Sequence, residues 1–241
     1  PGVWKALRRC GIPTRSRSEA RRLALRHEKF TYHDSEGNIR FTQAVTYDEK
    51  FLSTPSCDLS WVTGVLVCSI VSTTNKRYGS ERLRLKFRTP DLELIDKTLA
   101  LMKCNARISE TSDGLYELCI TQQDILQGIW DSLKTTYCAP CLIRGIFDSY
   151  ANIHPYLTPL CEIASNDKET IRILRDGLRK QKNVRSEFIP VSENKSKLRF
   201  TGKYVAKLAE ILYSDSTELN RLNRKYELFK LSAYKYGVEI N

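Results

Sequence analysis

Two stretches of the chain, residues 143–151 (IRGIFDSYA) and residues 62–70 (VTGVLVCSI), share one pattern. Each is a mainly apolar run with a glycine at its third position, and these glycines, Gly145 and Gly64, are 81 positions apart. A glycine inside a helix costs about 1 kcal/mol relative to alanine, so it is favoured where another backbone must come close. The sequence therefore predicts two apolar helices that cross at Gly64 and Gly145.

The elements predicted around these two helices follow the same order twice. The first copy is a helix at 59–70, a strand at 82–88, a helix at 90–103, strands near 106–110 and 115–121, and a helix at 122–133. The second copy is a helix at 141–150, extended chain at 153–163, a helix at 168–182, strands at 184–190 and 197–201, and a helix at 203–213. This repetition predicts a pseudo-twofold molecule of two αββαββα halves whose equivalent helices meet at the centre.

We expect four segments along the chain. Residues 1–54 form a basic N-terminal arm and a weakly patterned linker, residues 55–137 the first half, residues 138–216 the second half, and residues 217–241 a C-terminal helix. The arm contains Arg8, Arg9, Arg15 and Arg17 among its many cations. A cationic surface of this kind is typical of proteins that bind polyanions.

The two central stretches resemble the nine-residue LAGLIDADG motif of the homing endonucleases, and residues 142–148 (LIRGIFD) are close to the second-motif pattern LRGLFDGDG. Residues 11–20 (GIPTRSRSEA) and 222–229 (LNRKYELF) are similar to flanking segments of the subset of this family that carries a helix-turn-helix. The resemblance implies an α/β LAGLIDADG fold in which the two halves form a saddle-shaped sheet surface against nucleic acid. It also implies that the basic arm is part of a helix-turn-helix.

The eighth position of the motif is acidic in this family, where the two acids hold divalent metal over the scissile phosphates. Ser69 and Tyr150 occupy these positions here. The resemblance therefore implies an inactive pseudo-endonuclease that needs no cofactor. The alternative is a Mg²⁺-dependent endonuclease that recruits Asp148, Glu162 or Asp58, and magnesium would be a cofactor only in that case.

Charge favours a nucleic-acid partner. Lys and Arg outnumber Asp and Glu by 39 to 28, which gives a net charge of +11 and a pI near 9.3. Cations alternate with apolar residues at 82–88, so one strand face is expected to be wholly cationic and to repel itself unless an anion lies over it. Besides the four arginines of the arm, the candidate binding residues are Lys76, Arg77, Arg82, Arg84, Lys86, Arg88, Lys195, Lys197 and Arg199.

These features leave the kind of nucleic acid open. Folded RNA, in an intron or a ribonucleoprotein with other proteins, and duplex DNA both present rows of phosphates to such a surface. A protein–protein scaffold is a third function class, for which the basic rows would be irrelevant. Because both halves lie in one chain, we expect a monomer.

The eight cysteines are scattered, and several lie inside apolar runs, which is typical of small buried side chains in a reducing, intracellular compartment. Cys138 and Cys141 have the CxxC spacing of some metal sites, but no second pair stands at zinc-finger spacing, so no metal site is expected. No apolar run is long enough for a membrane span, and no membrane association is expected.

Overall fold

The computed structural model describes residues 30–33, 39–42, 45–74, 81–165, 168–182, 184–193 and 195–240. The chain divides into two compact units, residues 1–46 and residues 47–241. In the first unit, strand β1 (Phe30–His33) pairs antiparallel with strand β2 (Ile39–Thr42). The helix-turn-helix-like part of the arm lies outside the described residues.

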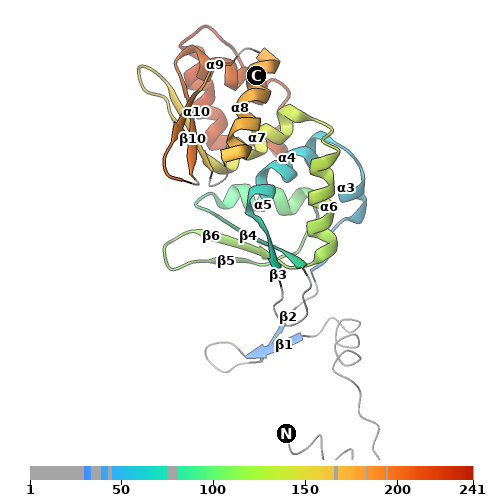
Figure 1. Cartoon of the computed structure of the whole chain (residues 1–241). Helices are drawn as coiled ribbons and strands as arrows, with labels where there is room; N and C mark the ends of the chain where they lie inside the picture. The colour runs from blue at the N-terminus through green and yellow to red at the C-terminus, as the bar shows by residue number, and fades with distance from the viewer. Residues whose placement is uncertain are drawn as a thin grey trace, which may run out of the picture. The chain divides into compact units, whose positions relative to one another are not determined.

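The second unit consists of two halves with the same order of elements (Figure 1). The first half contains α4 (Cys57–Leu66), β3 (Ile70–Thr74), β4 (Glu81–Thr89), α5 (Leu92–Leu101), β5 (Ile108–Glu110), β6 (Tyr116–Ile120) and α6 (Gln123–Lys134). The second contains α7 (Ala139–Tyr150), β7 (Ala151–His154), β8 (Leu160–Ser165), α8 (Lys168–Lys182), β9 (Glu187–Pro190), β10 (Ser196–Thr201) and α9 (Lys203–Tyr213). The predicted αββαββα order is present in both halves.

Each half contains one four-stranded antiparallel sheet, and the two sheets have equivalent strand orders. The order is β3-β4-β6-β5 in the first sheet and β7-β8-β10-β9 in the second. By this order β4 corresponds to β8, and β6 corresponds to β10. The expected α/β fold class with two pseudo-symmetric halves is therefore present.

Helices α4 and α7 pack against each other at the centre of the unit (Figure 1). Ser56 caps α4 by accepting a hydrogen bond from the Leu59 amide at 3.0 Å, and Pro140 stands in the first turn of α7, where the missing N–H costs nothing. Trp61 and Phe147 are fully buried on these helices. Because most residues of α4 are buried, this helix is part of the core on nearly every side.

The C-terminal segment connects the two halves. The predicted single helix from residue 217 is instead a short 3-10 turn, η2 (Glu218–Asn220), followed by α10 (Asn223–Tyr234). Phe229 of α10 packs against Tyr213 of α9. At the start of α10, Arg224 donates two hydrogen bonds to Asp91 in the first half, at 2.9 and 2.8 Å.

Two predicted boundaries are corrected. The segment 1–54, interpreted as a basic arm and a linker, contains β1, β2 and helix α3 (Glu49–Ser53), and α3 packs on α6 within the second unit. The compact unit therefore begins before residue 55, since the Asp48 amide donates to the Met102 carbonyl at 2.9 Å. The helix predicted at 59–70 ends at Leu66 and continues as a 3-10 turn, η1 (Val67–Ser69), before β3.

None of the helices in the described part of the chain combines the length and the apolar character that a membrane crossing requires.

Candidate nucleic-acid interface

The two motif glycines lie against each other where α4 and α7 cross. A Cβ atom on Gly145 would lie 2.2 Å from the Trp61 carbonyl oxygen and 3.0 Å from the Cα of Gly64. A Cβ atom on Gly64 would lie 2.1 Å from the Leu142 carbonyl oxygen. Because both obstacles are backbone atoms, only glycine fits at either position without moving a helix.

The two residues at the eighth motif position meet where the central helices end. Tyr150 is the last residue of α7, and Ser69 closes the 3-10 turn after α4. Their hydroxyl oxygens are 2.6 Å apart, and the Tyr150 ring packs edge-on against Phe87 of β4. Burial raises the pKa of Tyr150, which keeps the phenol neutral at physiological pH. Two neutral hydroxyls thus face each other at this place.

Asp148, two residues before the end of α7, is completely buried. It accepts hydrogen bonds from the Tyr213 hydroxyl at 2.7 Å, from Trp61 Nε1 at 2.9 Å and from the Leu222 amide at 3.1 Å. Burial raises the pKa of Asp148, and these donors act in the opposite direction. The carboxylate is therefore fully used in connecting α4, α9 and the start of α10.

The other two acids considered from the sequence lie at separate places. Glu162 of β8 accepts from Arg199 at 2.9 Å, and this hydrogen bond is the main reason why the pKa of Glu162 is lowered. Asp58 stands in the first turn of α4, at the opposite end of that helix from Ser69, and accepts from Asn220 at 2.8 Å. The structure does not bring these three carboxylates together.

The basic row on β4 is exposed, as its alternation predicts. Arg82, Arg84, Lys86 and Arg88 are exposed, while Leu85 and Phe87 between them are completely buried. The neighbouring strand β6, however, places an anion beside this row. Glu117 on β6 lies opposite Arg88 in the sheet register and forms ion pairs with Arg88 and, at 3.3 Å, with Lys86. The hydrogen bond from Arg88 lowers the pKa of Glu117 to about 2.

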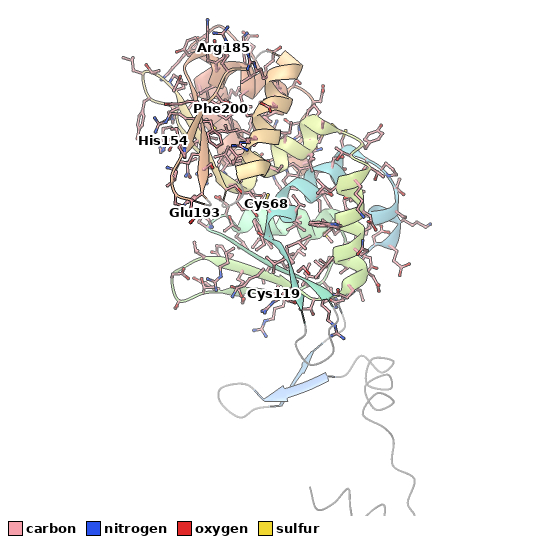
Figure 2. All side chains as sticks on the ribbon, viewed as in Figure 1. Cys68, Cys119, His154, Arg185, Glu193 and Phe200 are labelled. Atoms are coloured by element: carbon pink, nitrogen blue, oxygen red, sulfur yellow. The ribbon has the colours of Figure 1, made fainter. Side chains whose placement is uncertain are left out.

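Arg82 and Arg84, in contrast, form no ion pair with a carboxylate among the described residues. Next to Lys86 on the neighbouring strand lies Cys119, whose thiol is exposed on β6 (Figure 2). Within this row, no carboxylate in the described part of the chain pairs with the positive charges of Arg82 and Arg84, whereas Glu117 pairs with those of Lys86 and Arg88. We call Arg82 and Arg84 the uncompensated pair.

The cations of the second half lie on a strand that is not the counterpart of β4. Lys197 and Arg199 are on β10, which corresponds to β6, whereas β8 is the counterpart of β4. Glu162 pairs with Arg199 at 2.9 Å and with Lys197 at 3.7 Å. In the first half the cations are on β4 and the acid is on β6, whereas in the second half the acid is on β8 and the cations are on β10. Among Lys195, Lys197 and Arg199, only Lys195, just before β10, is exposed.

The remaining candidates, Arg8, Arg9, Arg15, Arg17, Lys76 and Arg77, lie outside the described residues. The residues that the sequence analysis missed are Glu117, which no local pattern links to Arg88, and Cys57. The sulfur atoms of Cys57, Cys138 and Cys141 lie within 4.8 Å of one another. The available signal was the separation of 81 positions between Cys57 and Cys138, the same as between the two glycines.

Comparison of the sequence with protein-family models and with curated proteins found no match. Comparison of the fold with solved structures found the homing endonuclease I-DmoI. A structure from a study of its mesophilic variants has a TM-score of 0.54 and 14% identity, and the match covers 71% of this chain and 95% of that chain. I-DmoI in complex with DNA and Ca has a TM-score of 0.53 and 13% identity over the same shares.

A further match is the N-terminal LAGLIDADG domain of DUF199/WhiA, with a TM-score of 0.46 and 16% identity, over 70% of this chain and 90% of that chain. The crossing of α4 and α7 at glycines, the two equivalent sheets and the match to I-DmoI agree. The chain has the fold of the LAGLIDADG homing endonucleases.

Proposed function

We propose that this protein binds structured nucleic acid on the exposed faces of its two sheets and does not cleave it. The observation that carries the proposal is the contact between Ser69 and Tyr150, whose hydroxyl groups are 2.6 Å apart at the positions where the family has its metal-binding acids. Neither side chain offers the anionic oxygen that Mg²⁺ prefers. The protein is a pseudo-endonuclease that has kept the fold and the cationic faces.

The alternative, a Mg²⁺-dependent endonuclease with other acids, has little support from the positions of those acids. Asp148 has no exposed surface and three hydrogen-bond donors, and Glu162 is held by Arg199. Asp58 is bound to Asn220 at the far end of α4. Two-metal phosphodiester chemistry needs acids that converge on one place, and these three do not. Magnesium would be a cofactor only if this alternative were correct.

The partner follows from charge. A net charge of +11 and the uncompensated pair Arg82 and Arg84 favour a phosphate backbone. I-DmoI has been crystallised with DNA, so duplex DNA is the first ligand to test, and folded RNA, alone or in a ribonucleoprotein, is the second. Both halves of the binding surface are present in one chain, and the protein acts as a monomer.

The experiment is to purify the protein from its source after crosslinking and to sequence the bound DNA and RNA separately. The recovered molecule is then tested for affinity by fluorescence anisotropy at several salt concentrations, and for cleavage with Mg²⁺ or Mn²⁺. Tight, salt-dependent binding of one class without cleavage supports the proposal. Site-specific cleavage, or the absence of any preference for nucleic acid over heparin, contradicts it.

A further inference from the structure

Three cysteines from distant parts of the chain form a cluster where the two central helices begin. Cys57 is the first residue of α4, Cys138 is the N-cap of α7, and Cys141 lies in the first turn of α7. Their sulfur atoms are all within 4.8 Å of one another, and all three cysteines are free. Cys141 is buried, whereas Cys57 and Cys138 are partly accessible to solvent.

The cluster follows from the pseudo-dyad. Cys57 and Cys138 are 81 positions apart, as are Gly64 and Gly145, so they occupy equivalent positions on the two helices. The close crossing at the glycines brings the first turns of α4 and α7 together, and the Cys138 amide donates to Ser60 of α4 at 3.2 Å. The CxxC spacing then adds Cys141 from the same turn of α7 as Cys138.

The surroundings of these sulfurs act on a negative charge in two opposite directions. The amide of Cys141 donates a hydrogen bond to Cys138 Sγ at 3.4 Å, and the positive ends of two helix dipoles converge on the cluster. Burial is the largest effect and raises the pKa of Cys57 and of Cys141, whereas the charge of Arg144 lowers both. A metal ion that binds these sulfurs would displace any protons that they carry.

Arg144 is a buried cation whose charge acts on these thiols. Its side chain is 1% exposed, and its guanidinium donates to the carbonyl oxygens of Asn220 at 2.9 Å and Leu212 at 2.7 Å and to the Asn220 side chain at 2.8 Å. These acceptors are all neutral, and no carboxylate in the described part of the chain forms an ion pair with Arg144. Asn220 also donates to the carboxylate of Asp58 at 2.8 Å, so the guanidinium is linked to an acid through Asn220. A buried cation of this kind favours further negative charge nearby. A divalent ion bound by three thiolates carries one net negative charge, which would balance it.

We propose that Cys57, Cys138 and Cys141 bind one Zn²⁺ ion, which joins the first turns of α4 and α7. Zinc is thiophilic and tetrahedral, and Zn–S bonds of about 2.3 Å place sulfurs about 3.8 Å apart, so the cluster contracts only slightly on binding. The three thiols release their protons to solvent, and water takes the fourth position. The site lies at the beginning of the central helices, while Ser69 and Tyr150 lie at their ends.

The test begins with protein purified anaerobically under reducing conditions. We expect one zinc per chain by mass spectrometry. After zinc removal, Co²⁺ titration is expected to give a thiolate-to-cobalt charge-transfer band and the intense visible bands of a tetrahedral site, with one equivalent bound and displaced by Zn²⁺. Chelation of the metal is expected to lower the melting temperature. Absence of the charge-transfer band in the reduced, folded protein overturns the proposal.

Variants identify the ligands. Cys57→Ser and Cys138→Ser are each expected to lose the cobalt bands, and Cys68→Ser, which changes an exposed thiol outside the cluster, is expected to keep them. If both cluster variants keep full cobalt binding, the assignment of the ligands is wrong. The proposal is also wrong if the isolated protein contains a Cys138–Cys141 disulfide and binds no metal after this disulfide is reduced. Where a variant does not fold, the titration of the unmodified protein still decides. Because metal binding is measured without nucleic acid, its failure leaves the proposed function unaffected.

Discussion

The hydroxyl oxygens of Ser69 and Tyr150 lie 2.6 Å apart although the two residues are 81 positions apart in the chain. One of the two hydroxyls donates a hydrogen bond to the other, and the Tyr150 ring packs against Phe87. A pair of metal-binding acids repels itself in the absence of metal, whereas this pair is stabilising without one. The residues that would replace the metal-binding acids therefore also form a stabilising contact where the two central helices end.

The first prediction concerns cleavage. Duplex DNA that contains the bound sequence is expected to stay intact after long incubation with Mg²⁺ or Mn²⁺, because no carboxylate stands at either eighth motif position. Nicking is measured on supercoiled plasmid, where a single cut changes mobility. A metal-dependent nick at one specific site would favour the endonuclease alternative.

The second prediction concerns the C-terminal end of α7, where Tyr150 lies. Tyr150→Asp is expected to lower the free energy of unfolding by about 2–4 kcal/mol, because it removes a half-buried ring and places a carboxylate beside Phe87. Urea denaturation measures the loss. The matched control is Tyr156→Asp, an exposed tyrosine for which a change below about 0.5 kcal/mol is expected. Equal effects of the two substitutions would show that the Tyr150 ring contributes no packing.

The third prediction divides the basic row on β4. Arg82→Ala with Arg84→Ala is expected to weaken nucleic-acid binding more than Lys86→Ala with Arg88→Ala, because Glu117 already pairs with the second pair of cations. Each lost phosphate contact lowers the log–log salt slope by about 0.7–0.9. Glu117→Gln releases both cations and is expected to tighten binding at low salt. Unchanged affinity and slope in all three folded variants would mean that this face is not the binding surface.

The sequence predicts the order of elements well because that order depends on local spacing. The alternation of Arg84, Leu85 and Lys86 and the apolar runs around Gly64 and Gly145 are visible within a few residues. The role of Asp148 could not be predicted, since its partners Trp61 and Tyr213 are 87 and 65 positions away. Glu117 was missed because its contact with Arg88 depends on strand register, which places residues 29 positions apart opposite each other.

The last prediction tests the helix crossing on which the fold depends. Gly145→Ala is expected to cost about 2–3 kcal/mol of stability, because the added Cβ would lie 2.2 Å from the Trp61 carbonyl oxygen and the backbone of α4 would have to move. Gly145→Leu, with its larger side chain, is expected to cost at least as much. Gly177→Ala is the matched control, since Gly177 is also helical, in α8, and a Cβ there would meet nothing within 4 Å. This control is expected to stabilise by about 0.5–1 kcal/mol, because alanine is the better helix former. Chemical denaturation of the three variants measures these changes in the free energy of unfolding, which are expected to have opposite signs at Gly145 and Gly177. A neutral Gly145→Ala would mean that α4 and α7 do not need to approach closely, and the close crossing would then not explain why Ser69 lies beside Tyr150 and Cys57 beside Cys138.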